Sequence, residues 1–322
     1  MTPTWNRRTV LGTAAALASA SALAATGSTP AAAAEASATI RVTTYNMLST
    51  EYDDHYPGIT WQTRRNAFAS MVRHPDNDPD ILAIQEGHER PQVDDLTTLL
   101  GRCYEHFTVT EDVSPRAIIW KAAKFDRLDA GTVELFDPSV EGYLHQRFGT
   151  WVRLEHLGTG QQLMVLNVHL PSGASEERHE IRYHAAQAMA EQVQQWSAGY
   201  GDIPVILLGD FNSYYNTVIG GYESGPKLLT SLGLPEAYAA APADTRLNPD
   251  YETYLDLNAA KAKPGVDGTR RLDYVHTYPT DRVEVLSWRL LINFREGSDT
   301  DLRTPVPSDH HPTSVTLRLS WT

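Results

Sequence analysis

Side chains that could carry out hydrolytic chemistry stand at the ends of four apolar runs in this sequence. Asn46 follows the run 40–45, Glu86 follows 81–85, His169 follows 163–168, and Asp210 and Asn212 follow 205–209. A rigid sheet can hold side chains at its strand ends in fixed mutual geometry. Any one of them could be a solvated loop residue or a turn Asx. Together with Asp273 and the Asp309-His310 pair near the C-terminus, they indicate a site.

The chemistry that fits these groups is hydrolysis of a phosphate ester. That reaction needs an attacking water, a group to orient and deprotonate it, positive charge on the phosphoryl oxygens, and help for the departing oxygen. We expect Glu86, with Asn46 and Asp309, to hold Mg²⁺, which prefers hard oxygen ligands and keeps several waters. Mn²⁺ could replace it. The sequence lacks the clustered His and Cys ligands of a zinc site.

The remaining polar groups receive roles around the water and the phosphate. We expect Asp210 to orient or deprotonate the water, and Asn212 to hydrogen-bond a phosphate oxygen or that water. In an extended segment, positions two apart share a face, so both could point into one cleft. We expect His169 and His310 to donate hydrogen bonds to the phosphate, and His310 could also give a proton.

Short apolar runs and helical patterns must position these groups. Runs rich in β-branched residues predict strands at 40–45, 81–85, 117–120, 151–154, 163–168, 205–208, 272–276 and 314–319. Apolar residues at helical spacing predict helices over 61–73, 93–100 and about 177–196. This mixed order favours an α/β sandwich over a strictly parallel βαβ sheet.

Six ordered motifs resemble those of the endonuclease/exonuclease/phosphatase superfamily, which includes pancreatic deoxyribonuclease I and neutral sphingomyelinases. They are Thr44-Tyr45-Asn46-Met47, Ile84-Gln85-Glu86, Asn167-Val168-His169-Leu170, Gly209-Asp210-Phe211-Asn212, Arg271-Leu272-Asp273-Tyr274-Val275 and Ser308-Asp309-His310-His311-Pro312. The resemblance covers nearly all of residues 39–322. It implies one α/β (α+β) domain: a four-layered, deoxyribonuclease I-like sandwich of two mostly antiparallel sheets flanked by helices.

The resemblance also implies roles for particular residues. It implies the same metal site, and it pairs Asp273 with His310, which would raise the imidazole pKa and fix its orientation. In the family pattern a variable residue follows Ser-Asp-His, so His310 is assigned to catalysis and His311 to the variable position. Arg147 matches an Arg-x-x-x-Trp element of many bacterial members. It could steer phosphate or form a structural salt bridge, and both remain open.

The composition gives an acidic protein with one cysteine. The 322 residues include 27 Lys and Arg against 40 Asp and Glu. This excess of negative charge argues against electrostatic binding of nucleic acid over the whole surface. A local site with a bound cation could still bind phosphate. Cys103 is the single cysteine, so no intramolecular disulfide can form. We expect it to be a buried or half-buried small hydrophobe.

The N-terminal segment has the pattern of an export signal. Arg7 and Arg8 precede an Ala-rich apolar stretch, and small residues continue to Ala38. Glycines and serines break the apolar stretch, which is too short and Ala-rich for a transmembrane anchor. We predict a twin-arginine signal over 1–38 and a secreted protein. Cleavage after Ala34, Ala36 or Ala38 remains open.

These observations predict a secreted, Mg²⁺-dependent phosphoesterase, with nucleic acid or another phosphodiester as the first choice of substrate. The alternatives are a sphingomyelinase-type phospholipase C and a phosphomonoesterase. No long apolar insertion would seat the protein in a bilayer, and no obligate protein partner is evident. Tyr214, Tyr215 and Tyr222 could stack bases, touch lipid headgroups or simply pack. A non-catalytic binding domain would have lost a catalytic position, and none is lost.

Overall fold

Two β-sheets form the centre of the protein. A computed structural model describes residues 36–87, 89–109, 116–137, 139, 147–265 and 270–321. The predicted export signal therefore lies outside the described residues, except for 36–38, which open the first strand. Within the described ranges, no helix is long and apolar enough to cross a membrane.

The larger sheet has seven strands in the order β11-β13-β14-β1-β2-β4-β3. In chain order these are β1 (Ala36–Asn46), β2 (Ile81–Gln85), β3 (Tyr104–Thr108), β4 (Ala117–Lys121), β11 (Arg246–Leu247), β13 (Val283–Leu290) and β14 (Thr313–Trp321). Two of its pairings, β1 with β2 and β11 with β13, are parallel. The others are antiparallel.

The smaller sheet has five strands in the order β12-β8-β7-β6-β5. They are β5 (Phe125–Glu134), β6 (Phe148–His156), β7 (Gln161–His169), β8 (Val205–Asp210) and β12 (Asp273–Tyr278). Only its β7–β8 pairing is parallel. Both sheets are therefore mostly antiparallel, as predicted.

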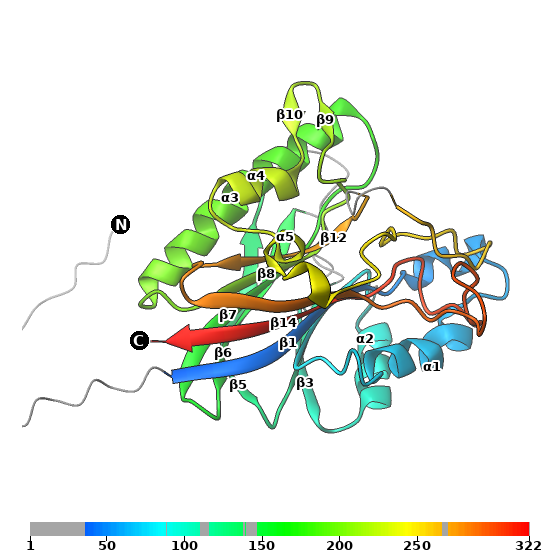
Figure 1. Ribbon diagram of the computed structural model, residues 1–322, viewed down its shortest axis with the longest axis horizontal. Coiled ribbons are helices and arrows are strands. Elements are labelled where there is room, and N and C mark those ends of the chain that lie inside the picture. The colour runs from blue at the N-terminus through cyan, green and yellow to red at the C-terminus, as the bar shows by residue number, and fades with distance from the viewer. Residues whose placement is uncertain are drawn as a thin grey trace, which may run out of the picture. The chain divides into compact units, whose positions relative to one another are not determined.

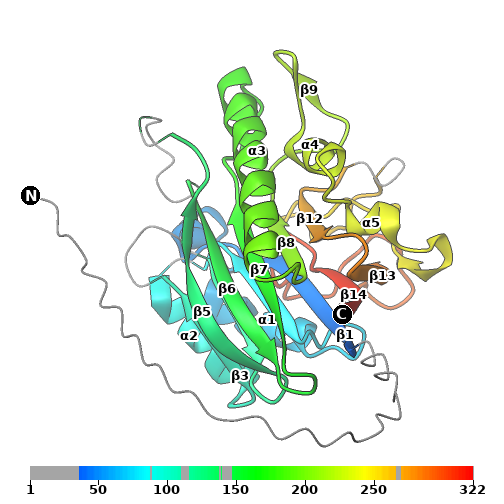
Figure 2. The ribbon, with the colours of Figure 1, turned by 90° about the vertical axis from the view of Figure 1, so that its left-hand side faces the viewer.

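Helices cover the outer faces of the two sheets (Figures 1 and 2). The pair α1 (Trp61–Val72) and α2 (Glu89–Leu100) covers the larger sheet, while α3 (Glu176–Gly199) and α4 (Gly225–Ser231) cover the smaller one. Shorter elements complete the described chain: η1 (Thr50–His55), the hairpin β9 (Val218–Ile219) and β10 (Tyr222–Glu223), α5 (Ala237–Ala240) and η2 (Ala243–Thr245).

The packing of β8 shows how the layers form. Its Ile206 and Leu208 side chains belong to the cluster between the sheets, together with Val42 of β1. Leu207, on the opposite face, packs with Met189 of α3. A strand buried on both faces reads as a continuous apolar run rather than an alternating one. The layers run helix, sheet, sheet, helix, which confirms the predicted four-layered sandwich.

Among the longer strands that the sequence did not predict, β3 and β5 lie at sheet edges, whereas β13 lies between β11 and β14 in the larger sheet. β5 is the edge of the smaller sheet and exposes residues 126–129, so it lacks an apolar run. β3 is an edge strand of the larger sheet. The expectation for Cys103 was wrong, because this residue is exposed in the turn before β3.

Candidate active site

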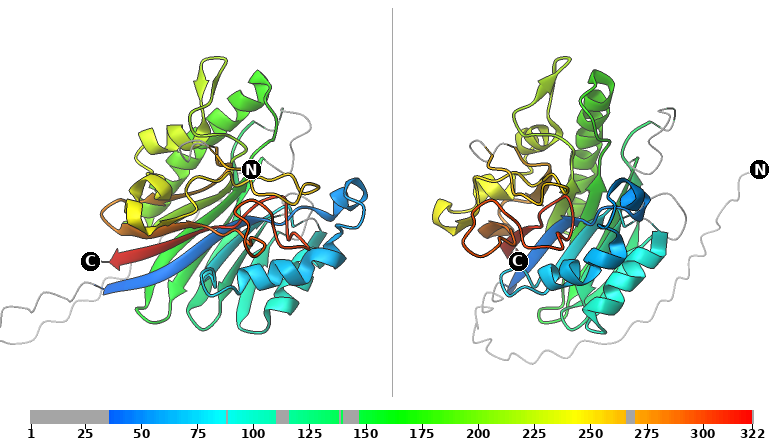
Figure 3. Two further views of the ribbon diagram at one scale, coloured as in Figure 1. Left: turned by 45° about the vertical axis from the view of Figure 1, so that its right-hand side comes forward. Right: turned by 90° about the vertical axis from the view of Figure 1, so that its right-hand side faces the viewer.

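Adjacent strands bring the predicted residues together at one end of the two sheets. In the smaller sheet, Asp210 is the register partner of His169 on one side and of Asp273 on the other. In the larger sheet, Asn46 at the end of β1 pairs with Gln85, which precedes Glu86. The loops that carry the remaining groups gather at the same end (Figure 3). Strand register thus places these groups on a rigid frame.

Three site residues lie just beyond strand ends in the left-handed backbone region. Leu48, Glu86 and Asn212 have φ angles of 57°, 56° and 49°. This region is uncommon for residues other than glycine and costs on the order of 1 kcal/mol or more. Each residue turns the chain as it leaves β1, β2 or β8. The strained turns direct the side chains of Glu86 and Asn212 into the space between the sheets.

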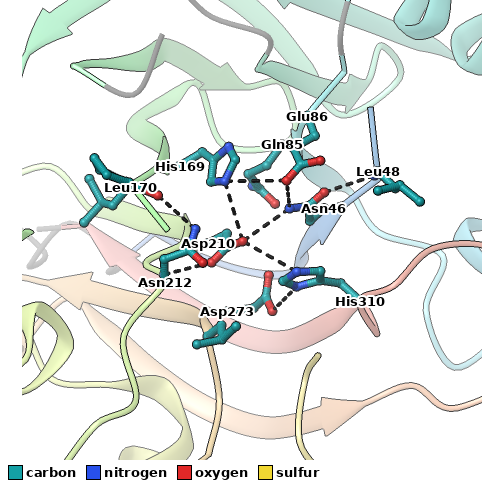
Figure 4. Close-up of polar contacts among 12 residues, drawn as sticks. Asn46, Leu48, Gln85, Glu86, His169, Leu170, Asp210, Asn212, Asp273 and His310 are labelled. Atoms are coloured by element: carbon teal, nitrogen blue, oxygen red, sulfur yellow. Dashed lines mark hydrogen bonds and ion pairs between the residues drawn. The ribbon is translucent and has the colours of Figure 1, made fainter. Parts of the chain in front are cut away.

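Asn46 links the two sheets across the site (Figure 4). Its Nδ2 donates to Glu86 Oε1 at 2.9 Å and to Asp210 Oδ2 at 3.2 Å. Its Oδ1 accepts from the amide of Leu48 at 3.0 Å. Behind it, Gln85 Nε2 donates to Asn167 Oδ1 at 2.7 Å. These bonds hold the two carboxylates in place although they come from different sheets.

His310 and Asp273 form a buried pair. His310 Nδ1 lies 2.8 Å from Asp273 Oδ2, and its Nε2 lies 3.7 Å from Asp210 Oδ2. Burial alone would lower the pKa of His310, but the carboxylates of Asp273 and Asp210 raise it well above its ordinary value. His310 is therefore protonated, with Nε2 directed toward Asp210. The structure brings Asp273 and His310 together as the resemblance implied.

His169 stands on the other side of Asp210 in a different protonation state. Its Nε2 lies 3.7 Å from Glu86 Oε1 and 3.8 Å from Asp210 Oδ2. Burial, together with a smaller effect of the nearby Arg116 guanidinium, lowers the pKa of His169 to about 3. A neutral imidazole can donate one hydrogen bond without bringing a charge. The two histidines thus offer a neutral and a charged donor beside one carboxylate.

Asp210 and Asn212 both line one cleft, as expected, but for a different reason. The strand ends at Asp210, so the extended alternation does not continue. Instead, the Asn212 amide donates to Asp210 Oδ1 at 2.9 Å, and Asn212 Nδ2 donates to Leu170 O at 2.9 Å. Burial raises the pKa of Asp210 to about 7, with the charge of His310 acting in the opposite direction.

Glu86, Asp309 and Asn46 fit a hard divalent cation. Glu86 and Asp309 line the same cleft. Burial raises the pKa of Asp309 to about 6; the His310 charge opposes this, and the carboxylate of Glu86 adds to it. Two carboxylates that disfavour each other's ionisation are stabilised by a cation between them. Asn46 Oδ1 has one hydrogen-bond donor and keeps a second lone pair.

A second group of potential ligands overlaps this site. Single ligand atoms of Asp210, Asp273 and His310 lie within 4.8 Å of one another. His310 Nδ1 is already engaged by Asp273 Oδ2 at 2.8 Å, so this nitrogen is not free to bind a metal. We therefore assign the cation to the oxygen-rich Glu86 side and the acid–base chemistry to this group.

The cleft measures about 400 Å³, and its lining includes residues that the sequence did not reveal. Besides the site residues, Leu48, Tyr52, Tyr56, Ser172, Tyr214, Tyr254 and Leu272 line it. Of the four tyrosines among them, only Tyr214 was considered from the sequence. Loop tyrosines carry no periodic signal, and nothing short of the fold brings 52–56, 214 and 254 together. Tyr222 instead donates its hydroxyl to Glu180 at 2.7 Å.

Arg147 and His311 lie apart from the cleft lining. Arg147 Nε is 3.1 Å from Glu134 Oε1, and its guanidinium packs 4.5 Å from the ring centroid of Phe148. Of the two interpretations left open, the structure shows the salt bridge. His311 is buried beside His310 and does not line the cleft. His310 is thus the histidine of the pair that faces the site.

Comparisons with known proteins agree with this geometry. The profile of the Endonuclease/Exonuclease/phosphatase family matches residues 43–310. A family member from Bacteroides thetaiotaomicron has a similar structure (TM-score 0.71, 22% identity, 89% of this chain and 97% of that one). The mannosyl-6-phosphatase of Bacteroides thetaiotaomicron is also similar (TM-score 0.65, 23% identity, 86% and 99%).

A curated relative has higher identity over a shorter span. Protein angel of Drosophila melanogaster is 28% identical over 197 residues, which cover 54% of this chain and 52% of that protein. The chain thus spans about half the length of this relative.

Proposed function

The chain belongs to the endonuclease/exonuclease/phosphatase family, and we propose that it is a metal-dependent phosphoesterase that hydrolyses phosphate esters outside the cytoplasm with Mg²⁺. One observation supports the catalytic part of this proposal most strongly. Asp210 stands on the floor of the cleft with Asn46, His169 and His310 within 3.2 to 3.8 Å of its Oδ2. A carboxylate in this position can act on water beside a phosphate that the two histidines hold.

The chain's own residues supply most of the reaction's needs. Asp210 orients the attacking water and accepts its proton, and its elevated pKa suits a base near neutral pH. Protonated His310, held by Asp273, donates to a phosphoryl oxygen and offsets charge that develops there. Neutral His169 and the second N–H of the Asn212 side-chain amide complete the set of donors.

A divalent cation would be held by Glu86 and Asp309 with Asn46 beside them. When bound, it supplies positive charge to the phosphoryl and departing oxygens. Mg²⁺ is proposed because oxygen donors dominate and the cleft is open enough to leave water on the ion. Mn²⁺ shares this ligand preference.

Export rests on the N-terminal pattern of Arg7-Arg8 and the Ala-rich segment. The pairing of β1 bears on where the predicted signal would be cleaved. Cleavage after Ala34 would leave β1 whole, whereas cleavage after Ala38 would remove three residues that pair with Leu319, Ser320 and Trp321 of β14. We therefore favour Ala34 among the three candidate sites. All three candidate sites end an Ala-x-Ala pattern, so the strand pairing alone favours Ala34.

The substrate is proposed at the level of a phosphate ester. The similar mannosyl-6-phosphatase is named for a monoester, and the family name covers both nucleases and phosphatases. A non-catalytic binding domain is disfavoured, because all eight predicted catalytic and metal-site residues are retained around one cleft.

The test is a metal titration of the purified protein after EDTA treatment. Phosphate or product release would be followed with a chromogenic phosphodiester, a chromogenic monoester, plasmid DNA, RNA and sphingomyelin. We expect hydrolysis of at least one ester that EDTA abolishes and Mg²⁺ restores. Full activity in EDTA would contradict the metal proposal, and no turnover of any ester with Mg²⁺ or Mn²⁺ would contradict the catalytic one.

A further inference from the structure

Four tyrosines line the active-site cleft, and together they are called the tyrosine wall below. Tyr52 and Tyr56 come from η1 and the residue after it, Tyr214 lies two residues beyond Asn212, and Tyr254 comes from the loop before β12. Three separate segments therefore supply rings to a single surface. Tyr52 is 44% exposed, so its ring is open to a ligand rather than used up in packing.

Tyr254 connects the tyrosine wall to the proposed catalytic residue His310. Its backbone forms an isolated bridge with His310, and its ring packs edge-on against the His310 imidazole at a centroid distance of 5.4 Å. A group that touches Tyr254 therefore lies next to the imidazole that holds the phosphate. The wall is within reach of the organic group attached to that phosphate.

Two cations support the wall from outside the cleft. Lys263 Nζ lies 4.9 Å from the ring centroid of Tyr254, and the guanidinium of Arg270 lies 5.4 Å from that of Tyr214. Neither cation lines the cleft. Arg270 is also engaged by Glu252, at 3.3 Å from Nε to Oε1. These contacts hold the two rings in place and leave the cleft side of each ring to a ligand.

The described lining of the cleft contains no lysine or arginine. A nucleic acid strand carries a phosphate at every nucleotide, and proteins bind it with cations along its path. Among the described lining residues, a second phosphate would meet no lysine or arginine side chain.

We propose that the cleft takes a phosphate ester of one uncharged, hydroxyl-bearing ring system, which lies against Tyr52, Tyr56, Tyr214 and Tyr254. This substrate class includes sugar phosphates and nucleoside monophosphates, and it rests on the proposed phosphoesterase function. Tyrosine rings stack on such groups, and their hydroxyls can hydrogen-bond to ring substituents. A cleft of about 400 Å³ suits a small ligand. The inference departs from the first choice made from the sequence, nucleic acid or another phosphodiester, and agrees with the phosphomonoesterase alternative.

The test compares four esters at a fixed Mg²⁺ concentration: a hexose 6-phosphate, a nucleoside 5′-monophosphate, acyclic glycerol 1-phosphate and a twelve-nucleotide single strand. We expect kcat/KM for one ring monoester to exceed the values for the acyclic ester and the oligonucleotide at least tenfold. The ring monoester with the higher kcat/KM identifies whether the substrate is a sugar phosphate or a nucleoside monophosphate. A higher kcat/KM for the oligonucleotide than for both ring monoesters would overturn the inference.

Variants separate ring recognition from folding. Tyr52→Ala and Tyr214→Ala should each lower kcat/KM for the ring ester about tenfold, mainly through KM, which is the effect of losing one stacked ring. Hydrolysis of glycerol 1-phosphate should change less than twofold. Tyr200→Ala, which removes a ring of similar exposure (41%) far from the cleft, should change neither. Equal losses on ring and acyclic esters would contradict the inference.

A binding measurement keeps this inference distinct from the proposed function. If no ester turns over, the proposed function fails, and calorimetric titration of the wild-type protein with the same esters still decides the question. Binding of a ring monoester at least tenfold tighter than glycerol 1-phosphate would support the tyrosine wall. Equal affinities would refute it.

Discussion

A buried arginine under the metal site gives the most quantitative prediction. Arg64, on α1, is fully buried. Its Nη1 donates to Met47 O and, at 3.0 Å, to Pro307 O, while its Nη2 donates to Leu48 O at 2.5 Å. Met47 follows Asn46, and Pro307 lies two residues before Asp309. One guanidinium thus joins the two loops that carry proposed metal ligands.

Replacing Arg64 removes these bonds and leaves three buried carbonyls without this donor. Hydrogen bonds to a charged group contribute about 1.5 to 3 kcal/mol each, and breaking a buried charged network costs about 3 to 5 kcal/mol. We expect Arg64→Met to lower the free energy of unfolding by about 4 kcal/mol. Arg64→Lys keeps the charge but not the fork of donors, so it should lose about half as much.

The functional readout is the Mg²⁺ concentration that gives half-maximal activity. In Arg64→Lys this concentration should rise about tenfold while the saturated rate changes less, because the loops are displaced and the reacting groups remain. Arg65→Met is the matched control. Arg65 lies next on the helix in a half-exposed ion pair with Asp95, a contact of about 0 to 1 kcal/mol. The reasoning fails if both methionine variants unfold at the same urea concentration, or if Arg64→Lys has a wild-type Mg²⁺ dependence.

Three further predictions concern the frame, acid stability and export. A Cβ at Gly209, where φ is +150°, would lie 2.0 Å from Val168 O, so Gly209→Ala should cost about 3 kcal/mol or more in urea unfolding; Gly199→Ala, where no atom lies within 4 Å, should not destabilise. Burial lowers the pKa of His276 from 6.5 to about 4, so protons favour the unfolded chain and stability should fall by up to about 3 kcal/mol as pH drops from 6.5 to 4. His276→Gln should flatten this slope relative to wild type, and an unchanged slope would contradict the assignment. The exported protein should begin at Glu35 by intact mass; a mass beginning at residue 39 would contradict the boundary drawn at Ala34.

Much of the fold could be predicted because the buried strands are marked by their composition. β2, β7 and β8 are buried on both faces, so their apolar runs stand out, and each ends at a polar residue. The edge strands β3 and β5 have no such runs, because one face or more meets solvent. Strand ends were therefore easier to predict than sheet edges.

The site residues at strand ends could be predicted, but those on loops could not. Asp210 and Glu86 follow apolar runs directly, and the ordered motifs supply the rest. The wall of tyrosines depends on how three loops meet, and Arg64 depends on which carbonyls the loops present to it. Neither has a local signal. The left-handed turns at Glu86 and Asn212 were also unforeseen, because strand patterns carry no information about the residue that ends them.

The most direct test of the account is the initial rate of Mg²⁺-dependent hydrolysis of a chromogenic phosphate ester by wild type and by Asp210→Asn. The substitution keeps the shape of the side chain while removing the charge that acts on water. We predict a fall in kcat of at least about a thousandfold, with circular dichroism and the unfolding midpoint showing a folded variant. A folded Asp210→Asn protein with a wild-type rate would contradict the assignment of the catalytic base.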